Sequence, residues 1–241
     1  MCGRFVSTST PDAIASYFGA TASIESLGQN FNVAPTHDIY GVVADPAGNK
    51  TVQAFHWGLI PSWAKERKIG AKMINARSET ITEKPSFRGL VKKHRVIIPM
   101  DGFYEWKPGS PDGPLNSKGK PLKQPMFIER IDGEPLAVAG LWSAWKDPAD
   151  PEQRWLHSAT VITTEANTDM SVVHDRMPVL VPPDRWEEWL DPSNADIESL
   201  SDLFTARNDG ILRLYDVSTD VNSVRNDTPA LTTPISGPES G

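Results

Sequence analysis

The sequence has 241 residues, of which 39% are apolar and 23% charged, with a net charge of −7. This length fits one domain or at most two small ones, and no apolar run is long enough to cross a membrane. The single cysteine, Cys2, excludes a disulfide within the chain and a thiolate-rich zinc site, so we expect no metal and no cofactor. The N-terminus lacks the organisation of a signal peptide, and we therefore expect a cytoplasmic protein.

Charge is unevenly distributed along the chain. From Lys65 to Arg95 there are ten Lys and Arg against three Glu, a net charge of +7, whereas the segment from Pro182 to the end carries −8. The basic segment predicts either a surface for an anionic partner or a solvated charged region.

The first predicted element is a helix that starts at Pro11, capped by Thr10 or Ser9, and stops at Gly19. Further helices are predicted at 86–93, where Ser86 could act as the cap, at 183–190 and at 194–204. Apolar runs bounded by turn residues predict strands at 39–43, 52–57, 95–98, 102–106, 126–131, 136–141, 155–163 and 211–217. Residues 99–101 should separate two of these strands, and the Pro-rich stretch from Lys107 to Pro125 predicts a long loop.

Many short strands with a few helices predict an α+β fold. We expect a single domain over residues 1–227, with a curled, barrel-like antiparallel β core flanked by short helices. Residues 228–241 are rich in Pro, Ser, Thr and Gly, which predicts a disordered C-terminal tail.

The position of Cys2 makes it the most informative residue. If Met1 is removed, Cys2 carries its α-amine and its thiol on adjacent carbons. An aldehyde would condense with the amine to an imine, and the thiol would then close a five-membered thiazolidine ring. Two other interpretations remain open: Cys2 could be a small buried residue, or an amide-hydrolysing nucleophile as in the class II glutamine amidotransferases, which also begin Met-Cys-Gly.

Two polar patterns could serve such a reaction. Within the basic segment, Asn75 could orient a substrate or the terminal amine and Arg77 could hold a phosphate, unless both belong to a helix-capping turn. Strand alternation places Phe103 and Glu105 on one side of their strand, which suits Glu105 to proton transfer if it faces inward. A glutamate that points from an edge strand into water is the alternative.

A histidine and an aromatic turn offer further candidates. Histidine is the residue type best suited to proton transfer near neutral pH, so His174 could protonate a sugar ring oxygen, with Arg176 at a phosphate, or it could be a structural histidine. Trp57 and Trp63 bracket an exposed-looking turn that suits base stacking, although one of the two is expected to pack in the core.

Together these patterns resemble the SOS response-associated peptidase family, which includes abasic-site shielding proteins. The resemblance spans residues 1 to about 225 and rests on Met1-Cys2-Gly3-Arg4-Phe5, Asn32-Val33-Ala34-Pro35-Thr36, the 57–63 turn, Asn75-Ala76-Arg77-Ser78-Glu79-Thr80, Phe87-Arg88, the 95–99 and 102–106 strands, Thr163-Thr164-Glu165-Ala166-Asn167 and His174-Asp175-Arg176-Met177-Pro178. One departure is Val96, where many relatives carry a second cysteine.

The resemblance implies a covalent sensor and shield of abasic sites in single-stranded DNA, which forms a thiazolidine crosslink through Cys2 after loss of Met1. Asn75 would position the reacting group, Glu105 would shuttle protons to and from the amine, and His174 would help to open the sugar. Associated autoproteolysis and abasic-site lyase activity are also implied.

The resemblance assigns the DNA contacts as well. Phosphates would be held by Arg4, Arg77, Arg88 and Arg176. Trp57 with Pro35 would keep the strand kinked, and Thr163 would lie near the lesion. The implied partners are single-stranded DNA with abasic sites and replication-fork proteins, with no membrane, and we expect a monomer that is nucleoid-associated when engaged on DNA. A Cys-dependent hydrolase and a non-catalytic DNA-binding module are the competing hypotheses.

Overall fold

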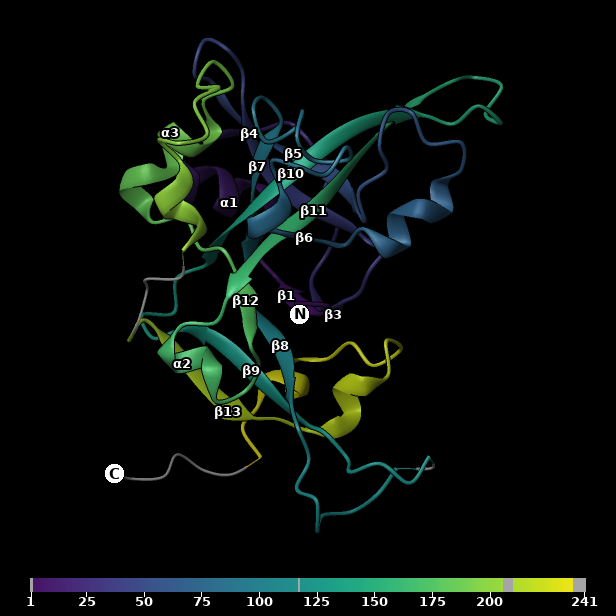
Figure 1. The fold of residues 1–241 in the computed structure, drawn as a ribbon, viewed down its shortest axis with the longest axis vertical. Helices are drawn as coiled ribbons and strands as arrows, with labels where there is room; N and C mark the ends of the chain where they lie inside the picture. The colour runs from purple at the N-terminus through teal and green to yellow at the C-terminus, as the bar shows by residue number, and fades with distance from the viewer. Residues whose placement is uncertain (1, 117, 206–209, 236–241) are drawn as a thin grey trace.

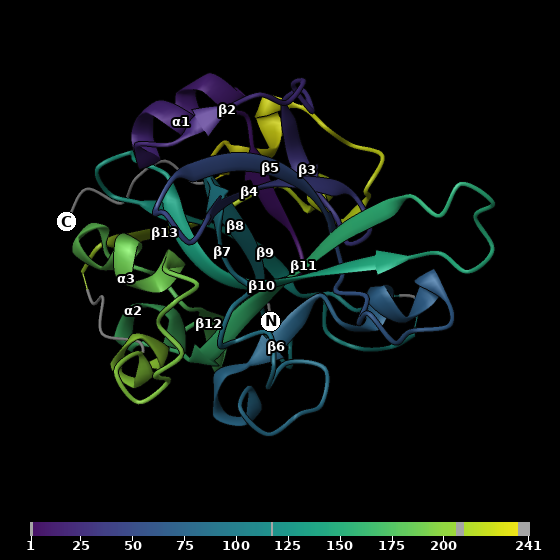
Figure 2. The same ribbon diagram turned by 90° about the horizontal axis from the view of Figure 1, so that it is seen from above.

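The structure is a computed structural model that describes residues 2–116, 118–205 and 210–235. Its strands form two sheets, which lie one above the other in Figure 1 and are seen from above in Figure 2. The strands of the larger sheet are β2 (Thr21–Ala22), β4 (Asp38–Ala44), β5 (Lys50–Trp57), β6 (Asn75–Arg77), β7 (Arg95–Met100), β10 (Leu136–Lys146), β11 (Trp155–Glu165) and β12 (Arg176–Pro178).

Five strands of the larger sheet close into a barrel. The order runs β11-β10-β7-β4-β5, and β5 pairs in turn with β11, which completes the ring. The predicted α+β fold with a curled, barrel-like core is therefore confirmed. The closing seam between β5 and β11 is parallel, whereas the other four pairings of the ring are antiparallel.

The smaller sheet lies below the barrel in Figure 1 and has the order β13-β9-β8-β1-β3. Its strands are β1 (Phe5–Ser7), β3 (Asn30–Val33), β8 (Gly102–Lys107), β9 (Gln124–Arg130) and β13 (Leu212–Asp216). The chain passes from the barrel to this sheet at Asp101, whose Oδ2 accepts hydrogen bonds from the backbone N–H (2.6 Å) and the hydroxyl (2.7 Å) of Thr8. This contact fixes β1 against the junction of the two sheets.

One hydrophobic cluster joins the barrel to the smaller sheet. It draws residues from all five barrel strands and from β1, β8 and β9, among them Phe55, Val161, Phe5 and Phe103, and it includes Cys2. Because side chains alternate along a strand, the neighbours of these residues pack into a second cluster, which the helices cover. The N-terminal cysteine thus lies where the two sheets share their core.

The helices are short. The α-helices are α1 (Pro11–Phe18), α2 (Thr168–Ser171) and α3 (Trp186–Leu190), and the 3₁₀ helices are η1 (Arg67–Lys72), η2 (Ser78–Thr80), η3 (Pro183–Arg185), η4 (Ser201–Phe204), η5 (Thr219–Asn222) and η6 (Pro229–Thr232). The predicted boundaries of α1 are confirmed: Thr10 Oγ1 accepts from the N–H of Ala13 (3.2 Å), and Gly19 closes the helix at φ 61°.

Two predicted helices are wrong. Residues 86–93 form a series of turns, in which the carbonyl of Phe87 accepts from both Leu90 (2.9 Å) and Val91 (3.0 Å), and Gly89 weakens any regular helix there. The segment 194–204 is helical only over η4, because the side chains of Asn194 and Asp196 accept from nearby backbone N–H groups and hold local turns instead.

The strand boundaries also differ from expectation. Residues 99 and 100 belong to β7 rather than to a break, and Pro99 pairs with Ala137. β10 extends five residues beyond its predicted end and β11 two, and together they project from the barrel as a long hairpin (Figure 1).

The C-terminal segment departs from the predicted disordered tail over residues 228–235. Leu231 is buried, the Tyr215 hydroxyl donates to the carbonyl of Thr232 (3.0 Å), and the N–H of Ile235 bonds to the carbonyl of Asp216 (3.0 Å). The remaining tail residues, 236–241, lie outside the described residues. No helix in the described part of the chain is long and apolar enough to span a membrane.

Candidate functional site

Cys2 is held at the start of the chain by Asn75. The Asn75 side-chain amide donates a 2.8 Å hydrogen bond to the carbonyl oxygen of Cys2. Asn75 is the first residue of β6, which pairs with β11 next to Val161, so the barrel itself positions the amide. Cys2 is 1% exposed. Met1, whose removal the proposed chemistry requires, lies outside the described residues.

Glu105 approaches Cys2 from the smaller sheet. It lies on β8 on the same side as Phe103, which packs into the cluster that contains Cys2, whereas Tyr104 packs on the opposite face. Glu105 is only 5% exposed, so the alternative of an edge glutamate pointing into water is wrong. Burial, and after it the negative charge of Glu105, raises the pKa of the Cys2 thiol far above its usual range. The thiol is therefore protonated near neutral pH.

A second group of predicted residues gathers where β6, β11 and β12 meet. Arg77 pairs with Thr163 across the parallel β6–β11 ladder, and Arg77 is exposed while Thr163 is buried. Arg176 on β12 donates through Nη2 to the carbonyl of Thr163 (2.7 Å). Arg176 also forms an ion pair with Glu79, with Nη2 donating to Oε2 (3.0 Å) and Nη1 to Oε1. The guanidinium of Arg176 is thus already engaged with a carboxylate.

His174 stands two residues before Arg176 in the connection from α2 to β12. The N–H of Arg176 donates to His174 Nδ1 (2.9 Å), and one carboxylate oxygen of Asp175 lies 2.8 Å from the same nitrogen. The two contacts suit different protonation states, because an unprotonated Nδ1 accepts from the N–H whereas a protonated Nδ1 donates to the carboxylate. Nδ1 of His174 can therefore act either as an acceptor or as a donor at this position.

The structure assigns the two tryptophans of the 57–63 turn to opposite environments. Trp57 is fully buried, packs edge-on against Phe5 (5.0 Å between ring centroids), and donates through Nε1 to the carbonyl of Ile74 (3.1 Å). Trp57 therefore offers no exposed ring face to a base, as expected for one of the two tryptophans. Its role with Pro35 in keeping the DNA strand kinked stays a prediction. Trp63 is 61% exposed instead.

The backbone explains this difference. Trp57 ends β5 on the same face as Phe55, so alternation points it into the core. Gly58 follows at φ 127°, and a Cβ there would lie 2.5 Å from the carbonyl oxygen of Gly70, so only glycine permits this close approach. The chain then turns outward, with the N–H of Ala64 bonded to the carbonyl of Pro61 (2.8 Å).

Trp63 borders an open hollow with a volume of about 580 Å³. Its apolar wall is completed by Ile69, and its charged rim contains Lys65, Lys68 and Lys72 together with Glu66. Glu66 forms an ion pair with Lys68. This part of the basic segment joins an exposed aromatic ring to several cations, a combination that suits single-stranded nucleic acid.

The other predicted DNA contacts are Arg4, Arg88 and Pro35. The backbone of Arg4 hydrogen bonds to the Cys2 thiol, whereas its guanidinium points elsewhere. Arg4 is half-buried and donates to Asn32 Oδ1 (2.7 Å) and to the carbonyl of Val221 (2.9 Å), which gives it a structural role between β3 and η5. Desolvation lowers the pKa of Arg4. Arg88 is exposed on the turns that follow η2, and Pro35 is half-buried after β3.

Not every residue of the basic segment lies on the surface. Arg95 is 3% exposed and donates to the backbone carbonyls of Val91 (2.7 Å), Trp189 and Asp191. Arg95 therefore ties the segment to α3 and contributes nothing to an anion-binding face. Among the described residues, no group of three or more His, Cys, Asp or Glu is arranged to hold a metal ion.

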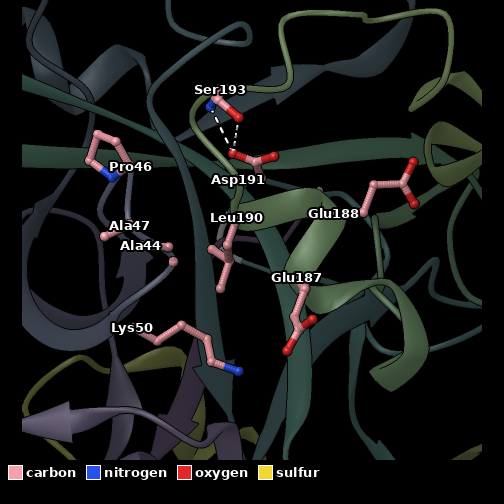
Figure 3. Close-up of a pocket in the computed structure, with 10 residues that line it drawn as sticks. Ala44, Pro46, Ala47, Lys50, Glu187, Glu188, Leu190, Asp191 and Ser193 are labelled. Atoms are coloured by element: carbon pink, nitrogen blue, oxygen red, sulfur yellow. Dashed lines mark hydrogen bonds between the residues drawn. The ribbon is translucent and has the colours of Figure 1, made fainter.

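Another hollow, of about 490 Å³, lies between the β4–β5 turn and α3 (Figure 3). Lys50 points toward it from β5, and Glu187 faces it from α3. Asp191 on its rim accepts hydrogen bonds from the backbone N–H (2.8 Å) and the hydroxyl (2.7 Å) of Ser193. None of its lining residues is a predicted site residue, and its acidic rim is unsuited to a nucleic-acid backbone.

Comparison with known proteins decides the family. Residues 1–224 match the profile of the SOS response associated peptidase (SRAP) family. The chain belongs to this family. The abasic site processing proteins YoqW and YoaM of Bacillus subtilis are each 40% identical to it over 233 residues, or 96% of this chain and 98% and 97% of their own lengths.

More distant SRAP relatives include eukaryotic proteins. The chicken abasic site processing protein HMCES is 35% identical over 203 residues, which cover 78% of this chain and 59% of that protein. A crystal structure of a Bacteroides thetaiotaomicron protein superimposes with a TM-score of 0.82 over 97% of this chain and 99% of its own, at 24% identity, and supports the fold alone. A phage-related protein of Bordetella bronchiseptica gives a TM-score of 0.67 at 28% identity, over 90% of this chain and 94% of its own.

Sequence reasoning named both Trp57 and Trp63 as stacking candidates but did not decide between them, although strand alternation from Phe55 points Trp57 inward. It missed Glu79. Glu79 lies inside the motif that identified Asn75 and Arg77, but no sequence signal indicates that it engages Arg176, almost a hundred residues away.

Proposed function

We propose that this chain processes abasic sites in single-stranded DNA by condensing the aldehyde of the opened sugar with Cys2. The observation that carries the proposal is the placement of Cys2 beside Asn75 and Glu105, in a chain whose 40%-identical relatives are named abasic site processing proteins. While Met1 is attached, the nitrogen of Cys2 is a peptide nitrogen and is not nucleophilic. The reaction therefore requires cleavage of the Met1–Cys2 bond, by the protein itself or by an aminopeptidase.

The reaction has two steps. The free α-amine of Cys2 adds to the aldehyde carbon, and loss of one water leaves an imine. The thiol sulfur then bonds to the imine carbon while the thiol proton moves to the nitrogen, which closes the thiazolidine ring. Both nucleophiles sit on one residue, so the second step is intramolecular and proceeds with high effective concentration.

Glu105 supplies the buried thiol with a proton acceptor, and Asn75 positions the residue that carries it. Because burial raises the pKa of Cys2, the sulfur attacks as a thiol whose proton must be taken up as the bond forms. The carboxylate of Glu105 can accept this proton and return it to the nitrogen. Asn75 fixes the carbonyl of Cys2 and therefore the direction of both reacting groups. His174, with a partner for each protonation state, opens the sugar ring.

The strand is held by the exposed groups. Arg77 contacts a phosphate. Trp63, which has lysines as neighbours, stacks on bases away from the lesion. The imine formed in the first step also allows strand cleavage by β-elimination, and ring closure competes with this lyase activity.

A Cys-dependent peptidase is the weaker proposal. Thiolate is the form of cysteine that attacks amides, and the same burial that raises the pKa of Cys2 disfavours thiolate. We therefore limit proteolysis to removal of Met1.

Intact-mass spectrometry tests the proposed function directly. The free protein should lack Met1, and mixing with a single-stranded oligonucleotide that has one abasic site should add the mass of the oligonucleotide less one water. Cys2→Ser should abolish the heat-stable, SDS-resistant adduct. The proposal fails if Cys2→Ser forms an adduct of equal stability, or if the reactive protein still carries Met1.

A further inference from the structure

Arg176 is occupied in the free protein by an internal carboxylate. Both terminal nitrogens of its guanidinium contact Glu79, and Nη2 also bonds to the carbonyl of Thr163 (2.7 Å). Its Nε is buried and has no hydrogen-bond partner among the described residues. The Arg176 side chain is 12% exposed whereas that of Glu79 is 44% exposed, so the carboxylate lies on the solvent side of the pair.

A carboxylate in this position presents two oxygens to arginine in the same fork geometry as a phosphate. The surroundings favour exchange of one anion for the other. Arg77 is exposed, and its positive charge acts on Glu79 together with that of Arg176 to lower the Glu79 pKa, with the hydrogen bond from Arg176 as the largest cause. Two cations and one carboxylate thus share this corner of β6, η2 and β12.

We infer that Glu79 is an internal competitor of the DNA backbone: it occupies Arg176 in the free protein, and a strand phosphate displaces it when DNA binds. This inference rests on the proposed function, since it assigns Arg176 to the strand. Glu79 then sets the affinity for undamaged strands, because each phosphate that engages Arg176 must first remove the carboxylate. The protein is then selective for damaged strands, because intact strands bind weakly and only strands that react covalently with Cys2 are retained.

The alternative is that Glu79 only positions Arg176 as a brace between η2 and β12 and remains in place on DNA. The two roles differ in their salt dependence. A phosphate contact releases counterions and steepens the dependence of affinity on salt by about 0.7 log units per log unit of salt for a single strand, whereas a brace does not change this slope.

The experiment measures binding of undamaged oligothymidine by fluorescence anisotropy over a range of salt concentrations. Glu79→Gln should bind on the order of tenfold more tightly at low salt with the wild-type slope, because the wild-type complex already contains the Arg176–phosphate contact. Arg176→Gln should make the slope shallower by about 0.7, because it removes that contact. Glu83→Gln is the matched control for Glu79→Gln, because it removes the same charge from an exposed residue of the same segment and should leave the affinity close to that of the wild type. The double variant Glu79→Gln/Arg176→Gln should lose the gain.

A second measurement needs no variant at Glu79. The side-chain Nε–H resonance of Arg176 in the wild-type protein should shift when oligothymidine is added, because the group bonded to the neighbouring Nη1 and Nη2 atoms changes from carboxylate to phosphate. An unchanged resonance, or an Arg176→Gln protein that keeps the wild-type slope, overturns the inference. The proposed function fails separately, if wild-type protein forms no adduct with abasic DNA whatever the behaviour of Glu79.

Discussion

Removal of the Asn75 side chain should slow crosslinking more than it weakens DNA binding. The perturbation is Asn75→Ala, which deletes the 2.8 Å hydrogen bond to the carbonyl of Cys2 and leaves that carbonyl without this donor. A hydrogen bond of this kind contributes about 1 kcal/mol net, and a rate changes tenfold for about 1.4 kcal/mol. The expected loss is therefore about five- to tenfold in the rate of adduct formation.

Asn75→Asp is the more severe change. It keeps the shape of the side chain but places a carboxylate oxygen against the carbonyl oxygen of Cys2, so attraction becomes repulsion. We expect at least a further severalfold loss of rate relative to Asn75→Ala. Asn49→Ala serves as the matched control, because it also removes one side-chain amide hydrogen bond, that to Asp45 Oδ2 (2.9 Å), in the distant β4–β5 turn.

The assay is a single-turnover time course with protein in excess over an oligonucleotide that has one abasic site, quenched in SDS. Saturating protein separates the rate of bond formation from strand affinity, and thermal denaturation of each variant reports folding. Wild-type rates in Asn75→Ala would refute the positioning role of Asn75. So would a slow rate that returns to the wild-type value at higher protein concentration.

Three further outcomes are expected. Trp63→Ala should weaken binding of undamaged single strands about tenfold in anisotropy, since stacking contributes about 1–3 kcal/mol per base, whereas Trp155→Ala, which removes another exposed tryptophan, should change little. Arg95→Met should destabilise the fold by about 3 kcal/mol in denaturant titrations without altering strand affinity, because buried carbonyls lose a charged donor. Burial lowers the pKa of His94 from its ordinary 6.5, so the unfolded state binds its proton first and stability is lost as pH falls below about 6.5. His94→Gln should therefore reduce the drop in Tm between pH 7.5 and 5.5.

Local chemistry made part of the fold predictable. The cap at Thr10 and the stop at Gly19 depend only on neighbouring residues, and both lie where the sequence places them. The helix expected at 194–204 fails for an equally local reason, since Asn194 and Asp196 bond to their own backbone. The parallel seam that closes the barrel could not be predicted in this way, because it joins β5 to a strand about a hundred residues later.

In the candidate site, too, residues in local motifs could be predicted, whereas long-range contacts could not. Motifs identified Asn75 and Glu105, and the structure brings both to Cys2 because the motifs end up on β6 and β8 beside the N-terminus. Strand alternation alone already predicts that the side chain of Trp57 points into the core. The pairing of Glu79 with Arg176 depends on long-range packing, and no composition or spacing rule could supply it.

In the proposed reaction, the raised pKa of the Cys2 thiol sets the order of the covalent steps. A thiol whose pKa is raised by burial and by Glu105 stays protonated near neutral pH and is a poor first nucleophile toward an aldehyde. In this proposal the α-amine therefore reacts first, and it becomes available only when Met1 is gone. Once the imine has formed, its carbon is bonded to the nitrogen of Cys2 itself, and the sulfur needs no exposure to solvent to reach it. The same burial that makes the thiol slow toward oxidants and amides costs the ring closure little, which separates crosslinking at Cys2 from general cysteine reactivity.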